Sequence, residues 1–137
     1  MPVKKMITGS CFCNAVQYRI TSAIQLAVNC HCNSCKKAGG GAFSSLAVVR
    51  EKRLEIISGE ESLASFQLGE QVVKHFCRHC GAAIFNRNRR YPGRCMVAIG
   101  SLDDPTVATP TVNIHCKEQL PWVKLDEKMQ NFAQDYS

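Results

Sequence analysis

The chain has 137 residues, of which 45% are apolar and 20% are charged, with nine cysteines and a formal net charge of +6. This length and composition favour a single globular domain over residues 1–137, since one hydrophobic core commonly serves about 100 to 150 residues. No apolar run approaches the length of a membrane span, and no apolar segment follows the N-terminal lysines as it would in a signal peptide. We therefore expect a soluble, cytoplasmic protein that does not enter a membrane.

Short segments with alternating apolar residues predict a mainly β fold. In the first of them, Val16, Tyr18 and Ile20 alternate with polar side chains, which is the period of a half-buried strand. Similar short runs follow at residues 26–30, 44–50, 54–57, 63–68, 72–76, 83–85, 95–99 and 112–115. Turn residues separate these runs, for example Ser58-Gly59 and Tyr91-Pro92-Gly93. Strands this short and numerous indicate an all-β protein.

Helix is expected in only two places. Asn33 or Ser34 is a suitable cap for a single helical turn that reaches Lys37. Asp126 is a suitable cap for a short C-terminal helix around residues 129–133. The prediction is therefore a β protein with little helix.

Seven of the nine cysteines lie in three groups along the chain. They are Cys11 and Cys13, then Cys30, Cys32 and Cys35, then Cys77 and Cys80. An odd number of cysteines without a visible signal peptide argues against a disulfide framework. Clustered thiols at such short spacings are typical of zinc sites, because two cysteines on one tight turn can reach the same ion.

Counting ligands indicates two different zinc sites. Cys77-Arg78-His79-Cys80-Gly81 has the form of a zinc knuckle, in which a glycine permits a left-handed backbone. A knuckle supplies two ligands, and the pair formed by Cys11 and Cys13 would complete a closed tetrahedral site. The three middle cysteines could then face a second ion whose fourth position is open to another ligand, as at a reactive zinc.

Spacing alone leaves alternatives open. Either outer pair could combine with two of the middle cysteines instead of with the other pair. The middle group could also be a closed site, completed by His31, His79, Cys95, His115 or Cys116. An iron–sulfur cluster is less favoured, because such clusters commonly use four cysteines and the middle group has three.

Several of these residues have an ordinary structural interpretation. Cys95 lies in an apolar strand, where a lone cysteine usually acts as a small core side chain, and Cys116 is similarly isolated. His31 and His79 are expected in loops, either solvated or next to metal ligands without binding the metal. His75 is expected on the surface of a strand.

A basic stretch lies in the second half of the chain, with no acidic residue between Gln71 and Leu102. It contains Lys74, Arg78, Arg87, Arg89, Arg90 and Arg94. These residues could form a solvated face, or some of them could hold carboxylates bidentately. Seven thiolates and two Zn²⁺ ions would lower the formal charge from +6 to about +3, which is weak evidence for a nucleic-acid partner.

Four segments carry a resemblance to a known family. They are Gly9-Ser10-Cys11-Phe12-Cys13-Asn14-Ala15-Val16, Cys30-His31-Cys32-Asn33-Ser34-Cys35-Lys36-Lys37, Phe76-Cys77-Arg78-His79-Cys80-Gly81 and Pro121-Trp122. With these cysteine groups in this order, nearly the whole chain resembles the glutathione-dependent formaldehyde-activating enzyme family, which includes the centromere protein V-like proteins.

The resemblance implies a β-tent of small antiparallel sheets around cysteine-bound zinc, with two Zn²⁺ per chain. It implies that a structural zinc is held by Cys11, Cys13, Cys77 and Cys80, and a catalytic zinc by Cys30, Cys32 and Cys35. It further implies a carbon–sulfur lyase that joins glutathione to formaldehyde, giving S-(hydroxymethyl)glutathione.

The expected partner is thus a small, glutathione-like thiol, bound as a thiolate at the open zinc. Lys36, Lys37 and the arginines between residues 87 and 94 are candidates to hold its carboxylates. The competing hypothesis is a zinc-stabilised binding module or a thiol carrier without turnover, in which the basic stretch would meet an anionic partner.

Overall fold

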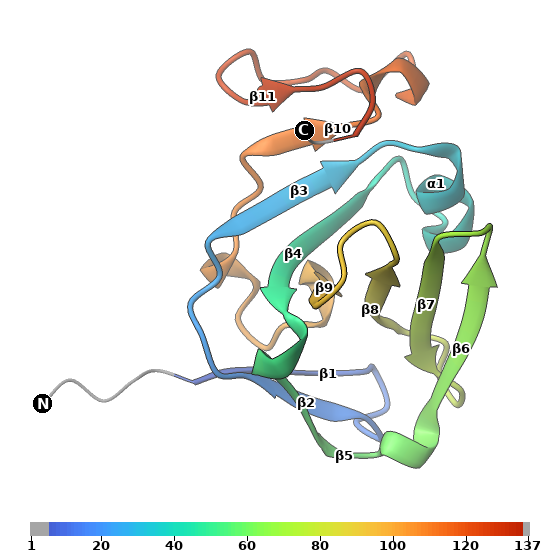
Figure 1. The fold of residues 1–137 in the computed structure, drawn as a ribbon, viewed down its shortest axis with the longest axis vertical. Helices are drawn as coiled ribbons and strands as arrows, with labels where there is room; N and C mark the ends of the chain where they lie inside the picture. The colour runs from blue at the N-terminus through green and yellow to red at the C-terminus, as the bar shows by residue number, and fades with distance from the viewer. Residues whose placement is uncertain (1–5, 136–137) are drawn as a thin grey trace, which may run out of the picture.

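The structure, a computed structural model, describes residues 6–135 and is mainly β (Figure 1). Its strands are β1 (Ile7–Ser10), β2 (Gln17–Ile20), β3 (Leu26–Cys30), β4 (Ser44–Arg50), β5 (Leu54–Ser58), β6 (Leu63–Leu68), β7 (Val72–Cys77), β8 (Ala83–Asn88), β9 (Arg94–Ala98), β10 (Val112–Ile114) and β11 (Gln130–Asn131). The α-helix of the described chain is α1 (Asn33–Gly39). Short 3-10 turns occupy Glu51–Arg53, Glu60–Ser62, Ile99–Ser101, Pro105–Val107 and Cys116–Glu118. The predicted mainly β fold with little helix is confirmed.

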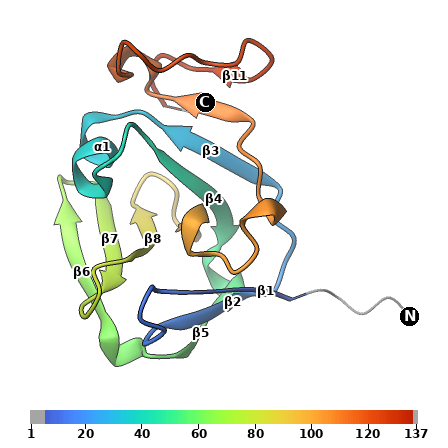
Figure 2. The same ribbon diagram turned by 180° about the vertical axis from the view of Figure 1, so that it is seen from behind.

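The strands form two sheets. One is a three-stranded antiparallel sheet in the order β1-β2-β5, and the other has the order β11-β10-β3-β4-β9-β8-β7-β6. The larger sheet is antiparallel from β3 to β6, whereas β10 runs parallel to both of its neighbours. Both ribbon views place the small sheet at the opposite end of the molecule from β10 and β11 (Figures 1 and 2).

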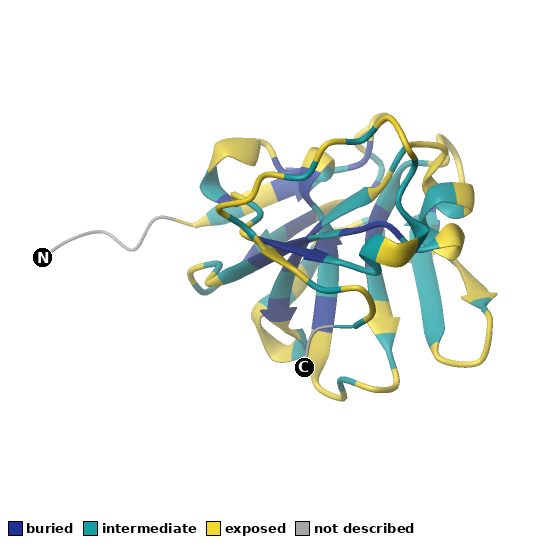
Figure 3. Ribbon diagram, turned by 90° about the horizontal axis from the view of Figure 1, so that it is seen from above, coloured by how far each residue is buried: buried dark blue, intermediate teal, exposed yellow. Residues whose placement is uncertain are grey.

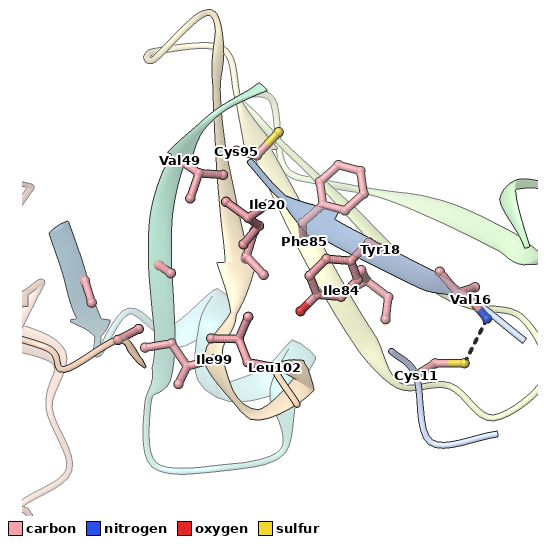
Figure 4. Packing of buried hydrophobic residues seen from close by; sticks show 14 of the residues in the cluster. Cys11, Val16, Tyr18, Ile20, Val49, Ile84, Phe85, Cys95, Ile99 and Leu102 are labelled. Atoms are coloured by element: carbon pink, nitrogen blue, oxygen red, sulfur yellow. Dashed lines mark hydrogen bonds between the residues drawn. The ribbon is translucent and has the colours of Figure 1, made fainter. Parts of the chain in front are cut away.

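The main core lies between the two sheets. Tyr18 and Ile20 of β2 are fully buried, as their alternation predicts, and they belong to one cluster with Val49 of β4 (Figure 4). Val97 of β9 belongs to the same cluster. Burying such a side chain contributes about 1.5 to 3 kcal/mol to folding. In Figure 3 the buried residues gather along the strands, and the loops around them are largely exposed.

A second, smaller cluster lies on the opposite face of the larger sheet. Its buried members are Val28 and Cys30 of β3, Leu46 of β4 and Val112 of β10. Successive residues of a strand point to opposite faces, so Leu46 joins this cluster while Ala47 joins the main core. This second face carries the candidate functional site described below.

Two strands of the structure were not predicted from the sequence. The C-terminal helix expected around residues 129–133 is wrong, because β11 forms there instead and its backbone pairs with β10. Strand β1 was not predicted, since only one of its four residues, Ile7, is a large apolar side chain.

No described helix has the length and apolar character needed to cross a membrane.

Gly59, which follows β5, lies against the loop that carries the first cysteine pair. Its φ is +84°, and a Cβ at this position would lie 1.8 Å from the carbonyl oxygen of Ala15. We expect Gly59→Ala to lower the free energy of unfolding by about 3 kcal/mol or more, because backbone strain adds to the clash. Urea denaturation followed by circular dichroism measures the loss.

Gly69→Ala is the matched control for this substitution. Gly69 also has a left-handed backbone, with φ of +68°, but a Cβ there meets nothing within 4 Å. Backbone strain alone should cost about 1 to 2 kcal/mol. Equal losses in the two variants would contradict the close approach of Gly59 to the cysteine loop.

Candidate metal centres

Two loops, one from each sheet, bring four cysteines together. The loop between β1 and β2 carries Cys11 and Cys13. Cys77 is the last residue of β7, and Cys80 lies in the loop between β7 and β8. The Sγ atoms of these residues, here called the four-cysteine group, all lie within 4.8 Å of one another. A metal ion in this group would therefore cross-link the small sheet to the larger one.

The two loops share a backbone design. In each, the N–H of the first cysteine donates to a carbonyl five residues further on: Cys11 to Val16 and Cys77 to Ala82, both at 3.0 Å. Each loop turns through one residue with a left-handed backbone, Asn14 with φ of 64° and Gly81 with φ of 78°. Asparagine and glycine tolerate this conformation best, so the sequence of each loop fits its turn.

Backbone N–H groups point at the sulfurs. The N–H of Val16 donates to Cys11 Sγ at 3.2 Å, and the N–H of His79 donates to Cys77 Sγ at 3.4 Å. The N–H of Ala82, followed by that of Cys13, lowers the pKa of Cys80 to about 6. Such donors favour the thiolate, which is the form that binds metal.

The distances between the sulfurs fit a zinc ion. Cys11 Sγ lies 3.6 Å from Cys13 Sγ, and Cys13 Sγ lies 3.7 Å from Cys77 Sγ. A tetrahedral zinc with bonds of about 2.3 Å to sulfur requires about 3.8 Å between its ligands. All four thiols are free rather than joined in disulfides. The donor set and its spacing therefore suit a closed, four-thiolate zinc.

The middle cysteines form a second group, here called the cysteine trio. Cys30 is the last residue of β3, Cys32 is the N-cap of α1, and Cys35 lies in its first turn. Their Sγ atoms also lie within 4.8 Å of one another, and no fourth ligand from the described residues joins them. The predicted cap at Asn33 or Ser34 is wrong, because Cys32 Sγ accepts the N–H of Cys35 at 3.3 Å.

The three thiols of the trio do not ionise alike. Hydrogen bonds from Cys30 and then from Cys35 lower the pKa of Cys32. The pKa of Cys30 is raised by its hydrogen bonds with Cys32 and Cys35 and by burial. A metal that binds all three sulfurs would therefore displace protons from the trio.

The trio lies where two cavities meet on one face of the larger sheet. The larger cavity, of about 1050 Å³, extends from α1 toward β7 and β8, and the smaller, of about 590 Å³, extends along β3, β4 and β9. Cys32, Cys35 and His115 line both. The four-cysteine group lines neither. Of the two groups, the trio is therefore the one placed to meet a small molecule.

His31, between two cysteines of the trio, is fully buried, so the expectation that it could be solvated is wrong. Its Nε2 lies 2.9 Å from Oδ1 of Asn113, and its ring packs on Phe43 with centroids 4.9 Å apart. Asn113 in turn donates to Asn131 of β11 at 2.8 Å. This network ties the trio loop to the C-terminal strands, and no local sequence signal marked Asn113.

The other cysteines and histidines lie outside the two groups. Cys95 is fully buried in the main core, as predicted, and Cys116 is half-buried. His79 is exposed, with its Nε2 3.1 Å from the Ser62 hydroxyl. His75 differs from the surface prediction, because its ring stacks on Phe85 with centroids 4.4 Å apart and burial, followed by Arg87, lowers its pKa.

The basic stretch is divided between several environments. Arg87 pairs with Glu51 at 2.7 Å, and Arg78 donates to the carbonyl of Leu63 at 3.1 Å. The members that line one of the two cavities are Lys74, Arg90 and Arg94. The other carboxylate candidates, Lys36, Lys37, Arg87 and Arg89, line neither cavity.

Together, the fold and the site define a small β protein with one closed and one open cysteine group, each able to hold a metal ion. Residues 6–118 match the family described as glutathione-dependent formaldehyde-activating enzyme. The chain belongs to this family.

Two relatives illustrate the relationship. A Halomonas elongata protein named "Putative glutathione-dependent formaldehyde-activating enzyme" is 24% identical over an alignment of 133 residues that covers 92% of this chain and 85% of the relative. The crystal structure of a Rhodobacter sphaeroides protein superposes with a TM-score of 0.60 at 27% identity, over 70% of this chain and 87% of the other. The similarity thus extends over most of the fold.

Proposed function

We propose that this chain holds two zinc ions and acts as a carbon–sulfur lyase-type enzyme on a glutathione-like thiol. Zinc in the four-cysteine group would be structural, and zinc in the cysteine trio would face the substrates. The relative from Halomonas elongata is named for formaldehyde activation with glutathione, which supports this substrate pair. The observation that carries the proposal is the cysteine trio, which has no fourth ligand among residues 6–135 and opens into two cavities.

The chemistry follows from this open position. Zinc bound by Cys30, Cys32 and Cys35 would stabilise the thiolate of a bound thiol near neutral pH. The thiolate sulfur then bonds to the carbonyl carbon of the aldehyde, the π pair moves to the carbonyl oxygen, and that oxygen takes a proton. Holding both reactants in adjoining cavities converts their encounter into a reaction within one complex.

The larger cavity has the lining that a thiol peptide requires. Lys74, Arg90 and Lys117 contribute cations to it, and Asn33, Gln71 and Asn86 contribute amide groups. Lys74 donates to the Ala38 carbonyl at 2.8 Å, and Arg90 lies 3.3 Å from Asp135. Because Lys117 has no ion pair in the described chain, it is the best-placed cation for a glutathione carboxylate.

Calorimetry with two matched ligands tests this function. Glutathione should bind to the zinc-loaded chain with release of a proton, detected as a dependence of the heat on the ionisation enthalpy of the buffer. S-methylglutathione keeps the carboxylates but cannot supply a thiolate, so we expect it to bind at least about tenfold more weakly. Equal affinity for the two, or no binding of either, would favour a zinc-stabilised binding module.

A further inference from the structure

The volume of the smaller cavity is much greater than formaldehyde alone would fill. Formaldehyde has two non-hydrogen atoms, and a single water molecule occupies about 30 Å³ of liquid. The cavity measures about 590 Å³, which is within the range of pockets that hold much larger organic ligands. Something other than the smallest aldehyde therefore fits it.

Apolar side chains line the stretch of this cavity that runs along β3, β4 and β9, beside polar groups such as Asn86 and His115. Leu26 and Val28 of β3, Leu46 and Val48 of β4, and Met96 of β9 line it. The strand register places these side chains in adjoining rows, with Val28 opposite Leu46 and Val48 opposite both Leu26 and Met96. Leu26, Val48 and Met96 are only half-buried, so apolar surface remains available to a ligand.

The far end of the same cavity is cationic. Arg50, Arg53 and Arg94 line it, and Arg50 lies opposite Arg94 in the pairing of β4 with β9. None of the three takes part in an ion pair within residues 6–135. The acidic residue that lines this cavity is Asp135, which already lies 3.3 Å from Arg90.

The two ends are separated by the length of β4. Cys30 lies opposite Ser44 at one end of this strand, and Arg50 ends the strand six residues later. Six residues of extended strand span about 20 Å, and Cys30 and Arg50 both line the cavity that follows this strand. The cavity therefore presents, in order, a cysteine-lined end, a stretch with apolar side chains and an arginine-lined end, and guanidinium groups suit carboxylates.

We infer that the smaller cavity binds an apolar stem that ends in a carboxylate, and that the electrophile of this chain is an aldehyde of that class. This inference rests on the proposed function and specifies its second substrate. The glutathione thiolate bonds to the aldehyde carbon, and the oxygen takes the proton that the thiol released, giving a hemithioacetal. No oxidant or reductant is needed.

Aldehyde selectivity is the first test. With zinc-loaded chain and glutathione, kcat/KM for hemithioacetal formation is measured by exchange NMR with 8-oxooctanoate and with octanal. We expect a preference of at least about tenfold for 8-oxooctanoate, from the charge-assisted hydrogen bonds of its carboxylate. Arg50→Gln and Arg94→Gln should each reduce this ratio, and the double variant should bring it close to one.

Arg19→Gln is the control, because Arg19 lies on the small sheet in an exposed pair with Glu55 and lines neither cavity. It should keep the wild-type ratio. A wild-type ratio near one, or a ratio that the double variant leaves intact, would overturn the inference.

Octanoate binding separates this inference from the proposed function. Calorimetry should show octanoate binding more tightly than octanamide, and the double variant should lose the difference while binding glutathione as before. If glutathione fails to bind but octanoate behaves as expected, the thiol function fails and the anion site stands. If the double variant weakens the binding of glutathione instead of the binding of octanoate, the arginines bind the thiol substrate and the inference is wrong.

Discussion

Cys77→Ser should be largely unfolded at 25 °C, so that heating it from this temperature shows no cooperative unfolding transition. Cys77 is fully buried and belongs to the four-cysteine group, which joins the two sheets. Structural zinc sites contribute about 10 to 16 kcal/mol in small zinc peptides, whereas a whole domain is stable by only about 5 to 15 kcal/mol. Removing one of four ligands is therefore expected to remove most of the folding free energy. Thermal unfolding followed by circular dichroism measures this loss of stability.

Cys95→Ser is the matched control for this loss. Cys95 is also fully buried, but it lies in the main core and outside both cysteine groups (Figure 4). Exchanging its thiol for a hydroxyl should cost about 1 to 3 kcal/mol and preserve a cooperative transition. Similar, mild losses in both variants would show that Cys77 acts as an ordinary core residue and not as a metal ligand.

Cys32→Ser should abolish the discrimination between glutathione and S-methylglutathione while the chain stays folded. Serine is a good N-cap, so its hydroxyl can replace the sulfur that accepts the N–H of Cys35. The trio, however, loses one of its three sulfur ligands. We expect the affinity ratio of the two ligands to fall from at least about tenfold to within about twofold, measured by calorimetry.

The same variant separates the roles of the two cysteine groups. Its melting temperature should stay within about 5 °C of the wild type, because the four-cysteine group is untouched. A variant that unfolds as Cys77→Ser is expected to do would contradict the division into a structural and a reactive group. A variant that still prefers glutathione tenfold would place the thiol elsewhere.

Local patterns predicted most of the secondary structure. The alternation at Val16, Tyr18 and Ile20 gave β2, and the runs at residues 44–50 and 63–68 coincide with β4 and β6. In β2 the alternation of side chains matches the burial of Tyr18 and Ile20, whereas in β6 the apolar Phe66 is exposed. The β-strand at β11 was mistaken for a helix, because its two residues, Gln130 and Asn131, are exposed and form a strand only by pairing with β10.

The site was predictable as far as its cysteines, because their short spacings mark loops that can each present several thiols. The surroundings were not predictable, since they depend on which distant strands become neighbours. Asn113 meets His31 because β10 runs parallel to β3, with Asn113 opposite Asn29. Arg50 and Arg94 converge on one cavity because β4 pairs with β9. Neither contact leaves a local pattern in the sequence.

Zinc K-edge X-ray absorption, with and without glutathione, tests the central claim most directly. Seven cysteines shared by two zinc ions give an average of about 3.5 sulfur ligands per zinc, at about 2.3 Å, with the remainder from lighter atoms. Adding glutathione should raise the average to about four, and adding S-methylglutathione should leave it unchanged. An average of four sulfurs before any thiol is added, or no change on adding glutathione, would contradict an open, thiol-binding zinc at the cysteine trio.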